Sequence, residues 1–284
     1  MKEVRFIADI GSNHDQSIQK CYRLIHQAKD IGCWGVKFQL FHHKKLFAPG
    51  FKNEIERMKQ WELPEEFIPK IAEYCESINI KFICTPFDLD AVDVLRPYVD
   101  YFKIGSYELL WLDLIKKVAM AGKPWMISCG MTDKSTLLEI RNAERITREI
   151  NPPVTIFHCN SNYPADPKDC DLTMIRRLGN YFGSEIGWSD HSKEPGVIHK
   201  AIALGAKVIE FHFGNGPESK IGHCWGMEMG KVIHDVRIGE IASRTAESES
   251  EVQDILGFDE EAKKWRTDPE DGHRPLKKYR EDLQ

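Results

Sequence analysis

Residues 101–130, YFKIGSYELLWLDLIKKVAMAGKPWMISCG, contain the unit whose repetition predicts the fold. Two short apolar runs, YFKIGS at 101–106 and PWMISC at 124–129, flank LLWLDLIKKVAMAG, in which apolar residues recur every three or four positions. Short apolar runs bounded by turn residues predict buried strands, whereas the longer periodicity predicts a helix. The stretch therefore predicts a strand, a helix and a second strand of a parallel sheet.

The same alternation recurs along the whole chain. The eight strand candidates are VRFIADI (4–10), WGVKFQL (34–40), KFICTPF (81–87), YFKIGS (101–106), PWMISC (124–129), TIFHCN (155–160), EIGWSD (185–190) and VIEFHF (208–213). Eight strands with intervening helices in about 250 residues predict an α/β fold of the closed (β/α)8 (TIM) barrel type. A doubly wound open sheet is the alternative. We expect the barrel to occupy residues 1–256, and residues 257–284 to form a charged C-terminal tail.

Composition excludes several classes of function. The 284 residues are 42% hydrophobic and carry a formal net charge of -5, so nucleic acid and anionic lipid are not expected as partners. The chain has no apolar run of about 18 residues, and its start is too short and acidic for a secretory signal. Its eight cysteines form no Cys-x-x-Cys pair and resemble small buried hydrophobes. We expect a cytoplasmic protein without a membrane segment.

Polar residues interrupt the predicted strands mainly at their C-terminal ends. In a (β/α)8 barrel these ends form the catalytic face. The polar residues there are Asp9, Asn13, His14, Lys37, Gln39, Thr85, Lys103, Ser106, Glu108, Ser128, Ser161, Tyr163, Ser189, Asp190, His191, Glu210 and His212. Taken singly, each hydroxyl is more simply explained as a structural cap of its strand. As a convergent set they predict an active site.

Lys37 and Lys103 indicate what that site binds. Each lysine follows apolar residues, and their strands are two apart, so the barrel should place both side chains in one layer. Two inward ammonium groups are costly unless an anion neutralises them. The alternative is that each lysine is a solvated residue at the rim. The pair favours a phosphate or carboxylate ligand, with hydroxyls as neutral donors.

His191 and His212 end adjacent predicted strands, seven and eight. Adjacent strands lie about 5 Å apart, so the two imidazoles could share one divalent ion. Two hydrogen-bonded structural histidines are the alternative, because the chain has no compact motif such as His-Glu-x-x-His. Mixed nitrogen and oxygen ligands would suit Mn²⁺, Mg²⁺ or another first-row ion.

Eight motifs in order resemble those of the sialic acid (N-acetylneuraminate) synthases, which condense phosphoenolpyruvate with an N-acylated hexosamine. The resemblance runs from about Phe6 to about Gly230. The motifs are IADIGSNHDQS (from residue 7), VKFQLF (36), TPFD (85), FKIGSYE (102), SCGM (128), HCNSNYPA (158), GWSDHS (187) and VIEFHF (208).

The resemblance implies a role for most of the strand-end residues. It assigns Asp9, Lys103, His191 and His212 to catalysis. His191 and His212 would hold Mn²⁺, which polarises the acceptor's aldehyde. Phosphoenolpyruvate would contact Lys37, Thr85, Lys103, Ser106, Ser128 and Ser189. Gln39 and Tyr163 would face the sugar, and Glu108 and Ser161 are further candidates for substrate contacts.

Three departures from the family's pattern limit the transfer of these roles to this chain. Asp9 replaces the usual Glu and is one methylene shorter. The family's Pro-Gly-Pro-Asp-His stretch appears here as GPESKIGHCWGME, with Gly222 in place of the carboxylate. We also expect the chain to lack the family's C-terminal antifreeze-like domain, which supplies an arginine to the partner subunit. Arg274 in the tail is our candidate for a replacement, because Pro275 keeps the preceding residue extended; a charged helix or dimer contact is the alternative for the tail.

These observations predict a metal-dependent transferase, a synthase of a nonulosonic or related 3-deoxy-2-keto acid that releases phosphate. Two alternatives remain. The enzyme could use phosphoenolpyruvate with a different aldehyde, or the chain could be a catalytically silent barrel that binds a sugar or phosphate. We expect the protein to act as a homodimer.

Overall fold

The computed structural model describes residues 3–133, 137–138, 140–142, 154–214, 223–243, 263–265, 268–271 and 273–280. The chain divides into two compact units, one of residues 2–238 and one of Met1 with residues 239–284. The domain boundary expected after residue 256 lies outside the described residues, and so does most of the helix expected after Ser135.

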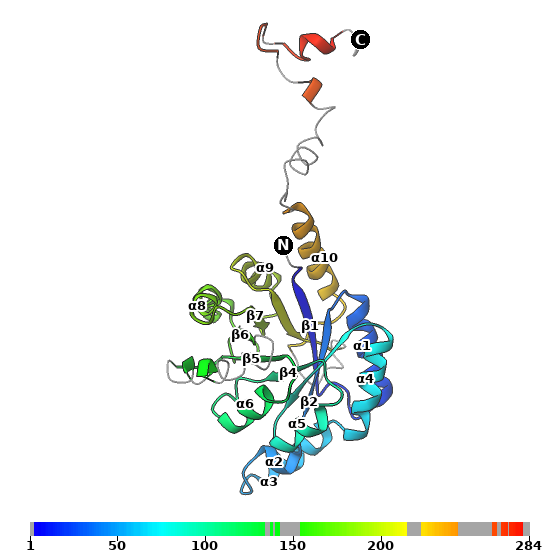
Figure 1. Cartoon of the computed structure of the whole chain (residues 1–284). Coiled ribbons are helices and arrows are strands. Elements are labelled where there is room, and N and C mark those ends of the chain that lie inside the picture. The colour runs from blue at the N-terminus through cyan, green and yellow to red at the C-terminus, as the bar shows by residue number, and fades with distance from the viewer. Residues whose placement is uncertain are drawn as a thin grey trace. The chain divides into compact units, whose positions relative to one another are not determined.

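Eight parallel strands close into a barrel in the first unit (Figure 1). The strands are β1 (Arg5–Gly11), β2 (Gly35–Leu40), β3 (Lys81–Pro86), β4 (Tyr101–Ile104), β5 (Trp125–Ser128), β6 (Thr155–Cys159), β7 (Ile186–Asp190) and β8 (Val208–His212). Each lies within or almost within the corresponding predicted run. Because β1 pairs with both β2 and β8, the sheet has no open edge. The predicted barrel is confirmed, and the open-sheet alternative is wrong.

Helices surround the strands, as Figure 1 shows. The longer ones are α1 (Ile18–Asp30), α4 (Ile68–Ser77), α5 (Leu89–Leu95), α6 (Leu112–Ala119), α8 (Thr173–Phe182), α9 (Pro195–Ala203) and α10 (Met229–Ala242). Two short helices, α2 (His43–Leu46) and α3 (Lys52–Met58), lie in the connection between β2 and β3. None of the described helices is long and apolar enough to cross a membrane.

Helix α1 shows how the local sequence produces these elements. The Ser17 hydroxyl accepts a hydrogen bond from the Lys20 backbone N–H at 3.3 Å and so caps the first turn. Leu24 and Ala28 are buried one turn apart on the face toward the barrel. The helix ends before Gly32, whose φ of 89° favours a residue without a Cβ.

The apolar core has two layers, separated by the sheet. The larger layer lies between the strands and the helices and contains most of the buried aromatic side chains, among them Trp188 and Phe6. The smaller layer fills the barrel interior with Ile7, Ile83, Met126, Phe157 and Val208. All eight cysteines are buried and free, as the sequence predicted.

The interior layer explains where the polar residues point. Side chains alternate across a strand, so the residue two positions beyond an interior apolar residue also faces inward. The pairs formed in this way are Ile7 and Asp9, Ile83 and Thr85, Met126 and Ser128, Phe157 and Cys159, and Val208 and Glu210. The barrel interior therefore changes from apolar to polar toward its C-terminal end.

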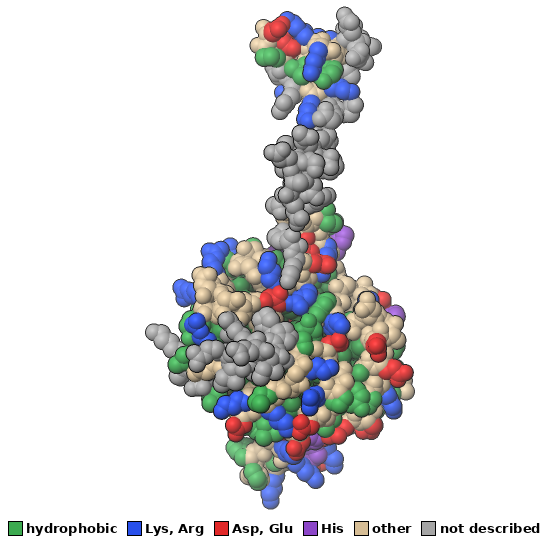
Figure 2. All heavy atoms as spheres, in the orientation of Figure 1, with side chains coloured by type: hydrophobic (Ala, Val, Ile, Leu, Met, Phe, Trp, Pro, Cys, Tyr) green, Lys and Arg blue, Asp and Glu red, His purple; other side chains and the backbone are tan. Residues whose placement is uncertain are grey.

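Charges of both signs are interspersed over the visible face of the molecule (Figure 2).

The second unit contains a tight arrangement of turns around Asp268. Its carboxylate accepts a hydrogen bond from the Lys277 backbone N–H at 2.7 Å, and its own N–H donates to the His273 carbonyl at 2.8 Å. Arg280 pairs with both carboxylate oxygens of Asp271. Short-range polar contacts of this kind order the described part of the tail without a large apolar core.

Candidate active site

A small polar cavity of about 100 Å³ opens at the C-terminal ends of the strands. Most of the residues predicted for the site line it: Asp9, Lys37, Gln39, Thr85, Lys103, Ser106, Glu108, Ser128, Tyr163, Ser189, His191 and His212. Phe87, Gly105, Tyr107, Cys159 and Glu210 line it as well. Every strand except β3, β5 and β6 contributes a charged or imidazole side chain directly or through the loop that follows it.

The two lysines are buried and each has a carboxylate partner. Lys37 Nζ lies 2.9 Å from Asp9 Oδ2, and Lys103 Nζ lies 3.5 Å from Glu210 Oε1. All four side chains are at most 5% exposed. In this structure the protein's own carboxylates balance the charges of the two lysines, and the sequence did not predict these pairs.

The charges of these pairs influence one another's ionisation. Burial lowers the pKa of Lys37, but Asp9 and Glu210 outweigh it and leave the pKa raised. Burial raises the pKa of Glu210, but Lys103 and Lys37 bring it below the ordinary value. For Asp9, burial outweighs the effect of Lys37, so its pKa is raised. Asp9 is thus the carboxylate of this group that most readily holds a proton.

Hydroxyl groups connect the lysine and histidine sides of the cavity. Lys103 Nζ donates to Ser128 Oγ at 2.6 Å, and Ser189 Oγ donates to Glu210 Oε1 at 3.0 Å. Ser189 Oγ also lies 3.4 Å from His191 Nε2. Glu210 Oε2 and Asp9 Oδ1 are buried without a hydrogen-bond partner among the described residues. These acceptors are available to a ligand that brings donors.

The two imidazoles predicted to bind a metal lie together, with ring centroids 5.0 Å apart. His191 Nδ1 lies 2.6 Å from the Asn160 carbonyl, a contact that requires a proton on Nδ1 and leaves the Nε2 lone pair available. Burial lowers the pKa of His191, and burial together with His191 and His223 lowers that of His212 further. Both rings are therefore neutral near pH 7, the form that binds metal ions.

The site offers few protein ligands for a metal. Among the residues that the structure describes, no group of three or more His, Cys, Asp and Glu side chains is arranged to hold an ion. His212 Nδ1 is buried and has no partner among the same residues, and His212 Nε2 lies 3.6 Å from Asp9 Oδ2. Two neutral imidazoles thus fit an ion whose remaining ligands are substrate oxygens and water.

Tyr163 covers the imidazoles. Its ring centroid lies 4.3 Å from that of His191 and 5.5 Å from that of His212, on which it stacks at 13°. Burial raises the pKa of the Tyr163 hydroxyl well above its ordinary value, so the phenol keeps its proton. Tyr163 therefore presents a neutral hydroxyl beside the imidazoles.

Glu108 lies in the loop after β4 and also lines the cavity. Burial raises its pKa to about 7, although Lys103 and Lys37 act in the other direction. Gly105 leaves room for it, since a Cβ at residue 105 would lie 2.5 Å from Glu108 Oε2. Near pH 7 Glu108 can either donate or accept a hydrogen bond.

Ser106 and Ser161 meet at the loop after β5. The Gly130 N–H donates to Ser106 Oγ at 3.1 Å, and Ser106 Oγ lies 3.2 Å from Cys159 Sγ. A Cβ at Gly130 would lie only 2.5 Å from Ser161 Oγ, so the two residues are closely packed. Ser161 itself is not among the residues that line the cavity. Arg274 belongs to the second unit, and its relation to the cavity remains a prediction.

Sequence reasoning left two features of the site without a role. Glu210 was noted only as a polar residue at the end of a strand, although its spacing of two from His212 placed it on the same inward face. Asp190, also noted there, instead accepts hydrogen bonds from Trp188 Nε1 at 3.2 Å and Trp225 Nε1 at 3.3 Å. Asp190 therefore holds the loop after β8 rather than a ligand.

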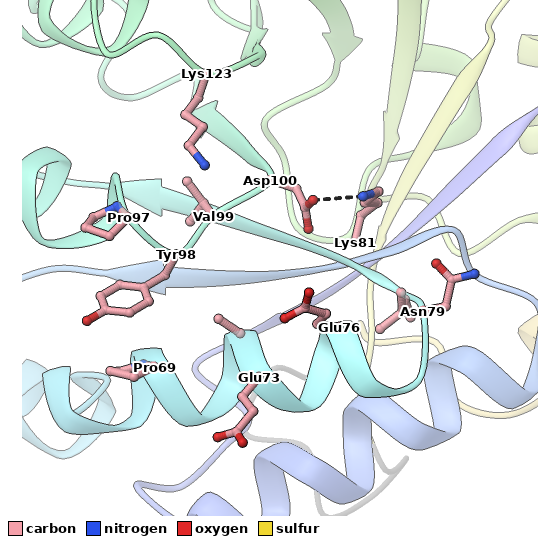
Figure 3. A pocket seen from close by; sticks show the side chains of 12 residues that line it. Pro69, Glu73, Glu76, Asn79, Lys81, Pro97, Tyr98, Val99, Asp100 and Lys123 are labelled. Atoms are coloured by element: carbon pink, nitrogen blue, oxygen red, sulfur yellow. Dashed lines mark hydrogen bonds and ion pairs between the residues drawn. The ribbon is translucent and has the colours of Figure 1, made fainter.

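A larger hollow of about 470 Å³ lies at the opposite end of the barrel (Figure 3). It lies beside α4 where β3 and β4 begin, and Lys81 and Asp100 pair at 2.8 Å beside it. The N-terminal ends of barrel strands serve stability rather than catalysis. The hollow is therefore not our candidate active site.

Comparisons with known proteins agree with this geometry. The chain is 38% identical over 210 residues to an uncharacterized protein of Methanocaldococcus jannaschii, covering 73% of this chain and 61% of that protein. It is 30% identical over 239 residues to N,N'-diacetyllegionaminic acid synthase of Campylobacter jejuni, covering 78% of this chain and 72% of the relative. The chain thus spans about three fifths of the first of these relatives.

A solved structure is also similar. The N-acetylneuraminic acid (sialic acid) synthetase of Leptospira borgpetersenii, determined in complex with citrate, superposes with a TM-score of 0.79 at 26% identity. The match covers 91% of this chain and 92% of that one. The family model described as the NeuB family matches residues 24–232, which include seven of the eight strands. The chain belongs to the NeuB family.

Proposed function

We propose that this chain condenses phosphoenolpyruvate with an N-acylated hexosamine to give a nonulosonic, sialic-acid-like 3-deoxy-2-keto acid and phosphate. The observation that carries the proposal is the presence of two buried lysines and two neutral imidazoles around one small cavity. Lysines suit an anionic substrate, and neutral imidazoles suit a metal that activates an aldehyde. The names of the relatives, synthases of legionaminic and neuraminic acids, support the same reaction class.

The lysine side of the cavity would bind phosphoenolpyruvate. Its carboxylate and phosphate would compete with Asp9 and Glu210 for Lys37 and Lys103, and Ser128 already accepts a hydrogen bond from Lys103. Thr85, Ser106 and Ser189 would add neutral donors. Because each lysine is charge-balanced before substrate arrives, binding must release or protonate a carboxylate. We expect Asp9 to be released from Lys37 as a carboxylate, and its raised pKa makes that carboxylate a stronger base.

The imidazole side would bind the acceptor and the metal. His191 and His212 would hold Mn²⁺, with Mg²⁺ or another first-row ion as alternatives, and the bound ion would polarise the acceptor's aldehyde for attack by the phosphoenolpyruvate carbon. The Asn160 carbonyl orients His191, since its contact with Nδ1 directs Nε2 toward the cavity. Gln39, Glu108 and Tyr163 would contact the sugar, and Ser161 would support the loop beside them.

Asp9 would then act on water. After the C–C bond forms, water adds at the cationic C2 of the former phosphoenolpyruvate, and phosphate leaves by cleavage of its C–O bond. Asp9 Oδ1 is buried without a partner among the described residues and can accept the proton that this water loses. Lys103 would stabilise the negative charge on the departing phosphate.

Phosphate release from phosphoenolpyruvate tests the proposal. We expect release with Mn²⁺ and at least one member of a panel of N-acylated hexosamines and other aldoses. Lys37→Ala and Lys103→Ala should weaken phosphoenolpyruvate use by roughly 10- to 100-fold, as charge-assisted hydrogen bonds of about 1.5–3 kcal/mol imply. Lys81→Ala is the matched control, because Lys81 pairs with Asp100 at the other end of the barrel. If no acceptor of the panel supports phosphate release, a catalytically silent sugar- or phosphate-binding barrel is favoured.

A different aldehyde is the second candidate for the acceptor. The observation in its favour is Gly222, which replaces the carboxylate expected at the sugar side of this family. The same panel decides: release with an aldose that lacks the N-acyl group, and none with N-acylated hexosamines, would identify it.

We also propose that the chain is a cytoplasmic homodimer with a barrel over residues 1–256 and a tail over 257–284, and that Arg274 contacts the substrate. Truncation after Ala262 should then lower turnover as much as Arg274→Ala does. Normal turnover by the truncated chain would exclude a catalytic tail, and a loss on truncation alone would indicate a packing role.

A further inference from the structure

His223 lies on a segment that is hydrogen-bonded to β8 and to the loop after β1. The Trp225 N–H donates to the His212 carbonyl at 2.8 Å, and Asn13 Nδ2 donates to Cys224 Sγ at 3.3 Å. Trp225 is held a second time through the contact of its indole with Asp190. Cys224 and Trp225 are therefore held against β7, β8 and the loop after β1. The position of His223 thus depends on these neighbours as well as on its own side chain.

The ring of His223 lies next to Tyr163 and His212, which line the cavity, although His223 itself is not among the lining residues. Its centroid lies 4.8 Å from that of His212 and 5.0 Å from that of Tyr163. His223 Nε2 is buried and has no hydrogen-bond partner among the described residues. Buried polar atoms in folded proteins are nearly always hydrogen-bonded, so an atom of this kind next to two residues that line a cavity indicates a missing ligand or water.

A hydroxyl group is the ligand that fits this nitrogen best. Neutral imidazole can donate or accept through Nε2, and a hydroxyl can do the same, so the pair is satisfied in either tautomer. A metal fits less well, because no three-ligand group occurs in the described part of the chain. The preceding residue is Gly222, so it contributes no side chain that could compete for the same hydroxyl.

We infer that His223 is an acceptor-binding residue, whose Nε2 hydrogen-bonds a hydroxyl of the sugar next to Tyr163 and His212. This inference rests on the proposed function for the identity of the acceptor. It assigns recognition of the acceptor to a side chain of the loop after β8, at the point where the chain has no carboxylate.

The test measures the KM of each substrate separately. His223→Ala should raise the acceptor's KM about 3- to 10-fold, as expected for loss of one neutral hydrogen bond, and leave the KM of phosphoenolpyruvate within about twofold. His223→Gln, whose amide nitrogen can occupy nearly the position of Nε2, should restore most of the loss. His199→Ala on exposed α9 is the control for an alanine at a histidine position, and the bound metal and Tm of each variant should equal those of the wild type.

Acceptor analogues sharpen the result. An analogue without the contacted hydroxyl should bind the wild type as weakly as the parent sugar binds His223→Ala. On His223→Ala the analogue and the parent sugar should have the same KM. Loss of bound metal in His223→Ala would instead make His223 a metal ligand, and equal changes for both substrates would make it a structural residue. An unchanged acceptor KM would mean that water or protein satisfies Nε2. Each of these three outcomes overturns the inference.

Calorimetric titration of the acceptor panel keeps the two proposals distinguishable. If the wild type releases no phosphate but binds a sugar that His223→Ala binds 3- to 10-fold more weakly, the synthase proposal fails and the inference holds. If turnover is present and His223→Ala is neutral in both assays, the synthase proposal holds and the inference fails. If the wild type neither turns over nor binds any sugar, both fail.

Discussion

Breaking the buried pair of Asp9 and Lys37 should destabilise the protein far more than breaking an exposed pair of the same length. The Lys37 Nζ to Asp9 Oδ2 distance is 2.9 Å, and the two side chains are 5% and 3% exposed. At an effective dielectric constant of about 20, the attraction at that distance is about 6 kcal/mol, part of which only offsets desolvation. Lys37→Met leaves Asp9 buried without its cation, a change that typically costs about 3–5 kcal/mol.

A double-mutant cycle measures the interaction energy between Lys37 and Asp9. We expect Lys37→Met and Asp9→Asn each to cost about 3 kcal/mol, the lower end of that range, because Glu210 and Lys103 lie nearby and share the charge. The double variant should cost clearly less than the sum, since two neutral side chains leave no unpaired charge. Urea unfolding of all four proteins at one pH gives the free energies of unfolding.

The pair formed by Lys81 and Asp100 is the matched control. Its Nζ to Oδ1 distance is 2.8 Å, but the side chains are 44% and 35% exposed. Lys81→Met should therefore cost about 0–1 kcal/mol. If Lys37→Met costs no more than Lys81→Met, burial does not determine the strength of the pair, and our account of the charge balance in the cavity is wrong.

Three further predictions concern metal, pH and packing. His191→Ala and His212→Ala should each lose bound metal and turnover together and keep their circular dichroism; normal turnover in metal-depleted buffer would refute the metal assignment. Glu108→Gln should be up to about 3 kcal/mol more stable than the wild type at pH 8 and equally stable near pH 4. The reason is that the raised pKa of Glu108, about 7, makes the folded wild type lose stability as the pH rises from 4.5 to 7. Parallel curves of Tm against pH for the two proteins would contradict this prediction. Gly187→Ala should destabilise by about 1–3 kcal/mol, since its Cβ would lie 2.5 Å from the Phe157 ring, and an unchanged urea midpoint would count against it.

The alternation of residues within each run was sufficient to predict the strands and the end of each strand at which inward polar residues lie. In VIEFHF the alternation of Val208, Glu210 and His212 with apolar neighbours is a property of the strand itself, whatever the strand packs against. The eight repeats, with helices between them, then left few ways to bury both faces of a parallel sheet. The barrel and the side of it that carries the polar residues were therefore predictable.

The partners of the polar residues depended on contacts between distant strands. Lys103 on β4 reaches Glu210 on β8, and nothing in the spacing of 107 residues between them indicates this. Asp190 resembled a site residue, yet two indoles bind it, one of them 35 residues away.

The sequence by itself determined the eight βα repeats, the polar end of the barrel and most of the residues that line the cavity, because these follow from periodicities within single elements. Only the tertiary structure decided that the lysines are neutralised by Asp9 and Glu210, that Asp190 supports a loop, and that His223 lies beside Tyr163 and His212. The physical reason is that charge balance and hydrogen bonding depend on distances of about 3 Å between side chains, and closure of the barrel sets those distances.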